Sequence, residues 1–126
     1  MTAPRFDRLA AAPGPLVAGF AGGRFLIGGE AWRAALLTPE RAEAWEAPAL
    51  AALESAHVGV ALALDPPPEF LLLGTGAASA LPPRAFVAAL EARGIGVEAM
   101  DSRAAARTWG LLRGERRWIA AALMPL

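Results

Sequence analysis

Three short apolar runs in the second half of the chain have the pattern of buried strands. Phe70–Leu73 is apolar at every position, which is typical of a strand buried on both faces. Gly96–Met100 is a second short strand, and Trp118–Met124 is a third, wholly apolar one. The stretches between these strands are too long for hairpin turns and require connecting segments of their own.

Both connecting segments carry helix signals. The first opens at the proline pair 82–83, keeps its apolar side chains on one side, and ends before Gly94, which suits the left-handed C′ position. The second can be capped by Asp101 or Ser102, repeats apolar residues at i, i+4 and i+7, and stops at Gly114. The order strand–helix–strand–helix–strand predicts parallel pairing with right-handed crossovers. The tight return after Gly114 leaves the direction of the last strand open.

The first half predicts short strands joined by tight turns. Leu16–Phe20 and Phe25–Ile27 flank a glycine-containing turn, which is the pattern of a hairpin. A second turn at Gly28-Gly29 leads into the segment Ala31–Leu37, which Pro39 closes.

Two further segments follow in this half. Pro48 opens a short helix over Ala49–Ala56, and Val58–Leu64 is predicted to be another strand. Alanine-rich runs favour helix by intrinsic propensity and strand by burial almost equally, so each assignment has a competitor.

The length of 126 residues fits one domain. Asp65-Pro66-Pro67-Pro68 is an extended connector inside that domain, because three consecutive prolines exclude a helix or a central strand. We therefore predict a single α/β domain over residues 1–126. It comprises a β-rich part with a short helix at 1–65 and the strand–helix–strand–helix–strand part at 69–124.

Composition excludes several classes of function. The chain has no cysteine, which rules out disulfides, cysteine-based zinc sites, iron–sulfur clusters and thiol nucleophiles. Its twelve basic residues are all arginine and are balanced by twelve acidic residues. A net charge of zero argues against a nucleic-acid partner.

Hydropathy predicts a chain that does not span a membrane. The mean hydropathy is +0.39, but much of it comes from alanine, and the apolar windows fall far short of the ~20 residues that cross a bilayer. Arg5, Asp7 and Arg8 interrupt the beginning of the chain, so we expect no signal peptide and a cytoplasmic location.

The turn Gly74-Thr75-Gly76 is the first candidate site. Ligands of open α/β sheets gather beyond the carboxyl ends of strands, where glycines let backbone N–H groups approach an anion. Ser79 completes a loose dinucleotide fingerprint, with Glu98 and Asp101 about twenty residues on. Three interpretations are open: a plain tight turn, a small-ligand or anion site, and a dinucleotide site. The delayed helix start weakens the last.

Asp101 and a run of arginines extend this candidate. Asp101 follows a strand at the same edge and either caps the next helix or holds a ligand hydroxyl; the cap is favoured. Arg103 and Arg107 share one helix face, and Arg113, Arg116 and Arg117 follow. We expect a solvated face in which carboxylates such as Glu98 and Glu115 pair with these arginines; an anionic ligand or an acidic protein surface is the alternative.

His57 and Trp45 have structural and functional interpretations. His57 is the sole histidine, and without cysteine or a second histidine it cannot build an ordinary metal site. No Gly-x-Ser-x-Gly elbow accompanies it, so a Ser–His–Asp arrangement is disfavoured. Trp45 is either a core anchor or an interface residue. We predict no metal, no cofactor and no catalytic residue.

Five stretches of the second half resemble the signature of one family: Glu69–Gly76, Gly94–Asp101, Ala105–Thr108, Gly114–Arg117 and Ala120–Leu123. It is the uncharacterised family that includes bacterial and archaeal proteins of unknown function and a mitochondrial respiratory complex I assembly factor. The first half is similar more loosely, at Leu36–Pro39 and Trp45. The chain has Trp109-Gly110 where the family often has an aromatic–Asn pair, so a role for that Asn does not carry over.

The resemblance implies a three-layer α/β fold around a mixed, mostly parallel five-stranded sheet with an added N-terminal β layer. It implies no established enzymatic activity, and it points to a non-enzymatic binding or assembly domain whose partner is another protein. The alternative is a small-molecule or anion binder, or an enzyme, that uses the Gly74–Gly76 loop. The residues that match the family pattern and form the expected ligand or partner cleft are Gly74, Thr75, Gly76, Met100, Asp101, Arg107 and Thr108.

Overall fold

The centre of the molecule is a five-stranded sheet with the strand order β5-β4-β8-β6-β7. The computed structural model describes residues 13–126, so Arg5, Asp7 and Arg8, which bear on the signal-peptide prediction, lie outside the described residues. The five strands are β4 (Ala35–Leu37), β5 (Ala42–Ala44), β6 (Phe70–Gly74), β7 (Gly96–Met100) and β8 (Ala120–Leu123).

The sheet is mixed, as expected. β6 pairs in parallel with both β7 and β8, which settles the direction of the last strand. β4 is antiparallel to β8 and to β5, so β4 runs opposite to the other four strands. Leu71, Leu72 and Leu73 of β6 are buried on alternate faces, which confirms a strand covered on both sides.

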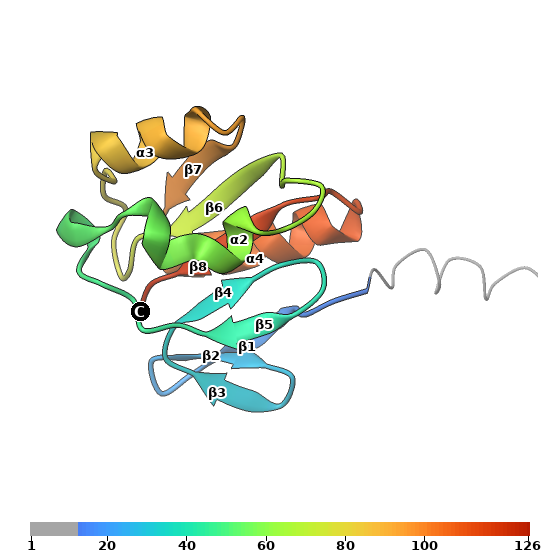
Figure 1. Cartoon of the computed structure of the whole chain (residues 1–126). Coiled ribbons are helices and arrows are strands. Elements are labelled where there is room, and N and C mark those ends of the chain that lie inside the picture. The colour runs from blue at the N-terminus through green and yellow to red at the C-terminus, as the bar shows by residue number, and fades with distance from the viewer. Residues whose placement is uncertain (1–12) are drawn as a thin grey trace, which may run out of the picture.

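A second sheet forms the added N-terminal layer. Its strands are β1 (Val17–Ala21), β2 (Arg24–Ile27) and β3 (Glu30–Trp32), paired antiparallel in chain order. The predicted hairpin between β1 and β2 is confirmed, and its turn places Gly22 and Gly23 at positive φ, where a Cβ would be strained. This sheet lies below β4 and β5 in Figure 1.

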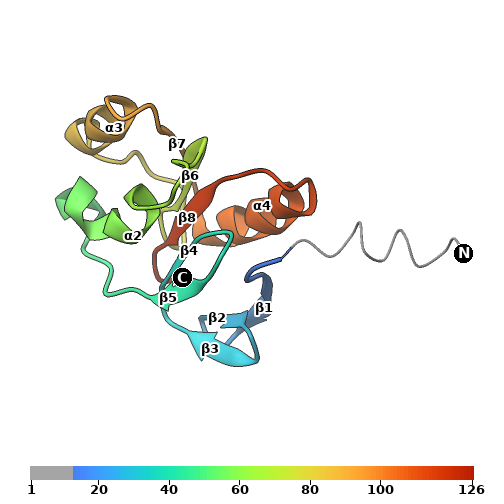
Figure 2. The same cartoon turned by 45° about the vertical axis from the view of Figure 1, so that its right-hand side comes forward.

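Helices cover both faces of the central sheet (Figures 1 and 2). α2 (Gly59–Leu62) and α3 (Arg84–Glu91) lie on one face, where Phe86 and Leu90 pack in the same cluster as Leu71 and Leu73. α4 (Ser102–Gly114) and the N-terminal sheet share the other face, around Leu72. The three-layer arrangement with its added β layer is therefore confirmed.

The predicted helix limits hold well in the second half. α3 begins directly after Pro83, and Gly94 follows it at φ +79°, the conformation expected of a glycine just beyond a helix. Asp101 is the N-cap of α4, and α4 ends at Gly114. The caps and the apolar periodicity were both local signals, so the sequence pattern was sufficient there.

Two predictions in the first half, Ala31–Leu37 and Ala49–Ala56, are wrong, and one strand was missed. Ala31–Leu37 is not one segment, because the chain leaves the N-terminal sheet after Trp32 and enters the central sheet at Ala35 as β4. Ala49–Ala56 is not one helix but contains η1 (Leu50–Ala52) and the start of η2 (Ser55–Val58), two short 3₁₀ turns. β5, with the sequence Ala-Glu-Ala, was not predicted, since it has no apolar alternation.

Val58–Leu64 is helical rather than extended. η2 runs into α2, and the buried residues are Val58, Ala61 and Leu64, which recur every third position. A strand would have buried every second residue, so the helical period and the high helix propensity of alanine decided this segment. In the part of the chain from residue 13 onward, no helix is long and apolar enough to cross a membrane.

Trp109 and Arg113 of α4 hold the segment that precedes β1. Trp109 is fully buried, and its Nε1 donates to the carbonyl of Pro15 over 2.9 Å. Arg113 Nη2 donates to the carbonyl of Pro13 over 3.1 Å, and Nη1 donates to the carbonyl of Arg117 over 2.6 Å. Arg113 is only 4% exposed, which corrects its assignment to a solvated face, and this burial lowers its pKa.

Glu69 and Arg117 join the beginnings of β6 and β8. Arg117 Nη2 donates to Glu69 Oε1 over 2.8 Å, and the N–H of Trp118 donates to Glu69 Oε2 over 3.3 Å. The predicted partners of the arginine run were Glu98 and Glu115, whereas the residue that bonds Arg117 is Glu69. The Arg117 hydrogen bond lowers the pKa of Glu69 and raises that of Arg117.

Replacing Trp109 with Phe should lower the free energy of unfolding by about 1–3 kcal/mol, because the substitution leaves a void and removes the donor to the Pro15 carbonyl. Urea denaturation measures this change. Leu111→Ala on the same helix is the control, since Leu111 is 67% exposed and its loss should cost less than about 0.5 kcal/mol. Equal effects from the two substitutions would contradict a role for Trp109 in attaching the N-terminal layer.

Glu69→Gln should lower the melting temperature at neutral pH, and the difference from the unmodified chain should close in acid. The pKa of Glu69 is lowered in the folded state, so its contribution to the stability of the fold is complete above its ordinary pKa of 4.5. This stabilisation is lost as the pH falls through the lower pKa that Glu69 has in the folded state. Because the pair is solvent-exposed, the shift is expected to be small. Thermal melts from pH 7 down to pH 3 test it; a gap that stays constant with pH would refute it.

Candidate functional site

Six of the seven predicted site residues meet where β6 and β7 end. The strand register places Gly74 opposite Met100, and the N–H of Thr75 donates to the Met100 carbonyl over 2.8 Å. Thr108 of α4 reaches the same point, with its Oγ1 3.5 Å from Met100 Sδ. Gly76 and Asp101 adjoin these residues in the chain. The parallel pairing therefore brings the two strand ends together as the sequence indicated.

Ser102 occupies the centre of this junction. Its Oγ accepts the N–H of Gly76 over 2.8 Å and donates to the carbonyl of Met124 over 2.7 Å. The side chain is fully buried, and a Cβ on Gly74 would lie 2.7 Å from Ser102 Oγ. Gly74 is therefore required for close approach of α4 to β6. Sequence reasoning considered Ser102 as a helix cap or, less favoured, as the serine of a Ser–His–Asp arrangement, and it missed this role.

The backbone donors of the loop bind acceptors within the protein. The N–H of Thr75 goes to Met100 and that of Gly76 goes to Ser102, so neither points to an external anion. A tight turn packed against a helix accounts for both glycines. The use of this edge as a ligand or partner cleft stays a prediction.

Asp101 and Arg107 have different surroundings. Asp101 Oδ1 accepts the N–H of Ala104 over 2.9 Å, so the favoured N-cap role is confirmed. Arg107 is exposed on α4, next to Thr108 in the chain, and among residues 13–126 its side chain forms no hydrogen bond or ion pair with the other six residues. Arg103, one turn earlier on the helix, lies over the ring of Phe20 at 5.5 Å from the centroid.

His57 has a structural role at the start of η2. Its Nδ1 accepts the N–H of Glu54 over 2.9 Å, which completes a capping box with the Glu54 side chain. Within residues 13–126, no three His, Cys, Asp or Glu side chains are grouped so that they could hold a metal ion. Trp45 is buried and donates to the His57 carbonyl over 2.9 Å, so the core interpretation of Trp45 is confirmed.

A sequence profile described as a protein of unknown function, DUF498/DUF598, matches residues 17–124. This chain belongs to the DUF498/DUF598 family. The match extends from β1 to the end of β8 and confirms the resemblance carried by the second half. No curated protein sequence matches the chain.

Several solved bacterial structures have the same fold. The crystal structure of a Bordetella parapertussis protein is 33% identical, covers 92% of this chain and 99% of its own, and has a TM-score of 0.82. The NMR structure of a Xanthomonas campestris protein is 35% identical with a TM-score of 0.74, over 87% of this chain and 83% of its own. A Bordetella pertussis structure, described as an Mth938-like domain, is 27% identical with a TM-score of 0.75, over 88% and 85%. None of these descriptions states an activity.

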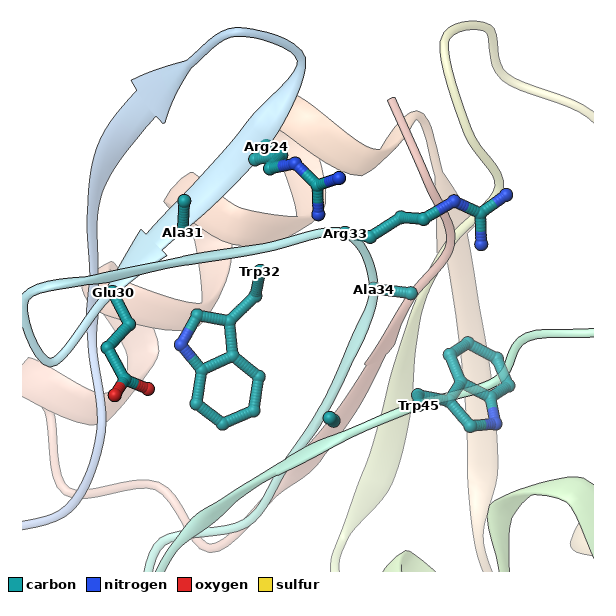
Figure 3. Close-up of a pocket in the computed structure, with 8 residues that line it drawn as sticks. Arg24, Glu30, Ala31, Trp32, Arg33, Ala34 and Trp45 are labelled. Atoms are coloured by element: carbon teal, nitrogen blue, oxygen red, sulfur yellow. The ribbon is translucent and has the colours of Figure 1, made fainter.

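The surface of this DUF498/DUF598 domain carries two features outside the predicted cleft. One is a pocket of about 370 Å³ beside Trp32 and Trp45, shown in Figure 3. The other surrounds Leu81, which is 92% exposed in the loop before α3. Sequence reasoning missed both. For Leu81 the sequence did contain a signal, because a leucine stands directly before Pro82-Pro83. A loop with few partners for a turn cannot bury such a side chain.

Ser102→Ala should lower the free energy of unfolding by about 1–3 kcal/mol, since it leaves the buried Gly76 N–H and Met124 carbonyl without their partner. Ser79→Ala is the matched control, because Ser79 is exposed and should change stability by less than about 0.5 kcal/mol. Urea denaturation compares the two variants. If Ser102→Ala were as stable as the control, the hydroxyl would not hold this junction together.

Proposed function

We propose that this DUF498/DUF598 domain is a non-enzymatic binding domain that docks on another protein. The observation that carries the proposal is the exposure of Leu81 at 92% of its surface. Leu81 does not stand alone. Apolar side chains from η1, the loop and α3 surround it, and we call them the Leu81 surface: Leu50, Ala51, Leu81, Pro82, Pro83, Val87 and Ala88.

Leu81 stands between two hollows of this surface. A hollow of about 450 Å³ lies on the side of Leu50 and Ala51. A second, of about 490 Å³, lies on the side of Val87 and Ala88, with Arg84 and Glu91 also lining it. A ridge between two depressions, apolar at the centre and charged at the margin, has the anatomy of a protein interface.

The Leu81 surface is preorganised. Pro82 and Pro83 restrict the backbone on one side of Leu81. On the other side, Thr75 Oγ1 donates to the carbonyl of Ala78 over 2.7 Å and accepts the N–H of Ala80 over 3.2 Å. A loop that is already ordered loses little conformational entropy on binding. Thr75, one of the predicted cleft residues, thus holds in place the loop that carries the proposed docking surface.

The family resemblance suggests the kind of partner. Because it includes an assembly factor of respiratory complex I, we propose subunits of a bacterial respiratory NADH dehydrogenase, met on the cytoplasmic side, as the partners to test first. The alternative, a small anionic ligand or a substrate at Gly74–Gly76, has less support, since the Gly76 amide is bound by Ser102.

Leu81→Ser should abolish capture of the partner without lowering the melting temperature, because the side chain contributes contact area to a partner but little to the core. A tagged copy is used to recover respiratory-complex subunits from its native cells. Leu111→Ser is the matched control, an exposed leucine on α4 that should leave recovery intact. Equal recovery by both variants, or loss with both, would contradict docking through the Leu81 surface.

A further inference from the structure

The two flanks of α3 have different surroundings. The helix buries Phe86 and Leu90 in the core, and its flank with Ala85 and Ala89 faces η1 and η2 across a hollow. In the described part of the chain, the elements packed against α3 are chiefly β7 and η2. The other flank lines the second hollow of the Leu81 surface. We call it the α3 flank, and its residues are Arg84, Val87, Ala88 and Glu91.

The α3 flank lies where the central sheet ends. β7 is the last strand of the sheet order, and α3 and β7 lie side by side at the top of both Figures 1 and 2. Gly96, through its N–H, and Met100, through its carbonyl, bond toward β6. By strand alternation, Val97 and Ala99 direct their backbone groups to the free edge. Proteins normally cover such an edge, so this rim of the molecule is suited to a contact with another chain.

The α3 flank carries one charge of each sign, with an apolar centre between them. Arg84 is the first residue of α3 and Glu91 is the last, about 10.5 Å apart along the helix axis. Within residues 13–126, neither side chain takes part in an ion pair. Ala88 is exposed and Val87 is half-buried between the two charges.

Helix stability does not explain this order of charges. The N-terminus of a helix favours acidic side chains and the C-terminus favours basic ones. α3 has no acidic residue in its first turn and no basic residue in its last turn, and instead has Arg84 and Glu91 at the reverse ends. A second α3 running antiparallel corrects the mismatch, because its glutamate comes to the N-terminus of the first helix and its arginine to the C-terminus.

We infer that two copies of this chain associate through the α3 flank, with their helices antiparallel about a two-fold axis. In a two-fold interface, each contact between two different residues occurs twice with the copies exchanged. Arg84 of each copy therefore meets Glu91 of the other, and the same register sets Val87 against Ala88 at the centre. The charge order of the flank is thus complementary to itself.

This self-association goes beyond the proposed docking of another protein and does not rest on it. It covers the Val87 side of the Leu81 surface, and the hollow beside Leu50 and Ala51 stays open. Because α3 has eight residues, the interface is small, and we expect a weak, reversible dimer.

Sedimentation equilibrium of the purified protein, from micromolar to millimolar concentration at low salt, tests the dimer. Arg84→Glu and Glu91→Arg should each weaken association by about fivefold or more, because each places like charges together at two points of the dimer. The double variant Arg84→Glu/Glu91→Arg should restore association, since both ion pairs re-form with their positions exchanged. Arg93→Glu is the control, an exposed arginine that lines a hollow beside α2 and should have no effect.

A second pair of variants tests the apolar centre. Ala88→Glu should abolish association, because it places two carboxylates at the two-fold axis, whereas Ala85→Glu on the opposite flank should not. In dilute protein, Arg84→Glu and Glu91→Arg should keep or raise the melting temperature, since each improves the charge at its helix end. Weaker association with undiminished stability distinguishes an interface from a contact within the fold.

Three outcomes would overturn the inference. The first is a protein that stays monomeric at every concentration. The second is association that neither charge reversal weakens. The third is a double variant that associates no better than the single ones.

Discussion

The hydroxyl of Ser102 is the contact on which the arrangement of the central sheet depends. It joins the turn after β6, through the Gly76 N–H, to the end of β8, through the Met124 carbonyl. It does so from the first turn of α4, and Gly74 permits the approach because it has no Cβ. Three elements distant in sequence are therefore fixed against one another by one buried side chain. A network of this kind is stabilising only when every member is satisfied, as it is here.

Arginine serves several physical purposes in this lysine-free chain. Arg113 is buried and bonds two backbone carbonyls, Arg117 forms an exposed ion pair, and Arg103 lies over an aromatic ring. Arg24 and Arg33 are exposed and adjoin the end of the β2–β3 pairing.

The two surface features are chemically distinct. The Leu81 surface is apolar and stiffened by prolines, as suits contact with a protein, while the pocket beside Trp32 and Trp45 has Arg24 and Arg33 in its lining.

The sequence alone determined the elements whose signals are local. β6, β7, β8, α3 and α4 were found from apolar periodicity, proline and glycine positions and the Asp101 cap, because each depends on residues a few positions apart. Only the tertiary structure decided which strands pair across long separations, such as β4 with β8, and that Ala-Glu-Ala becomes β5. It also decided that Ser102 joins the turn after β6 to the end of β8. These outcomes depend on contacts between distant segments, whose partners no local pattern identifies.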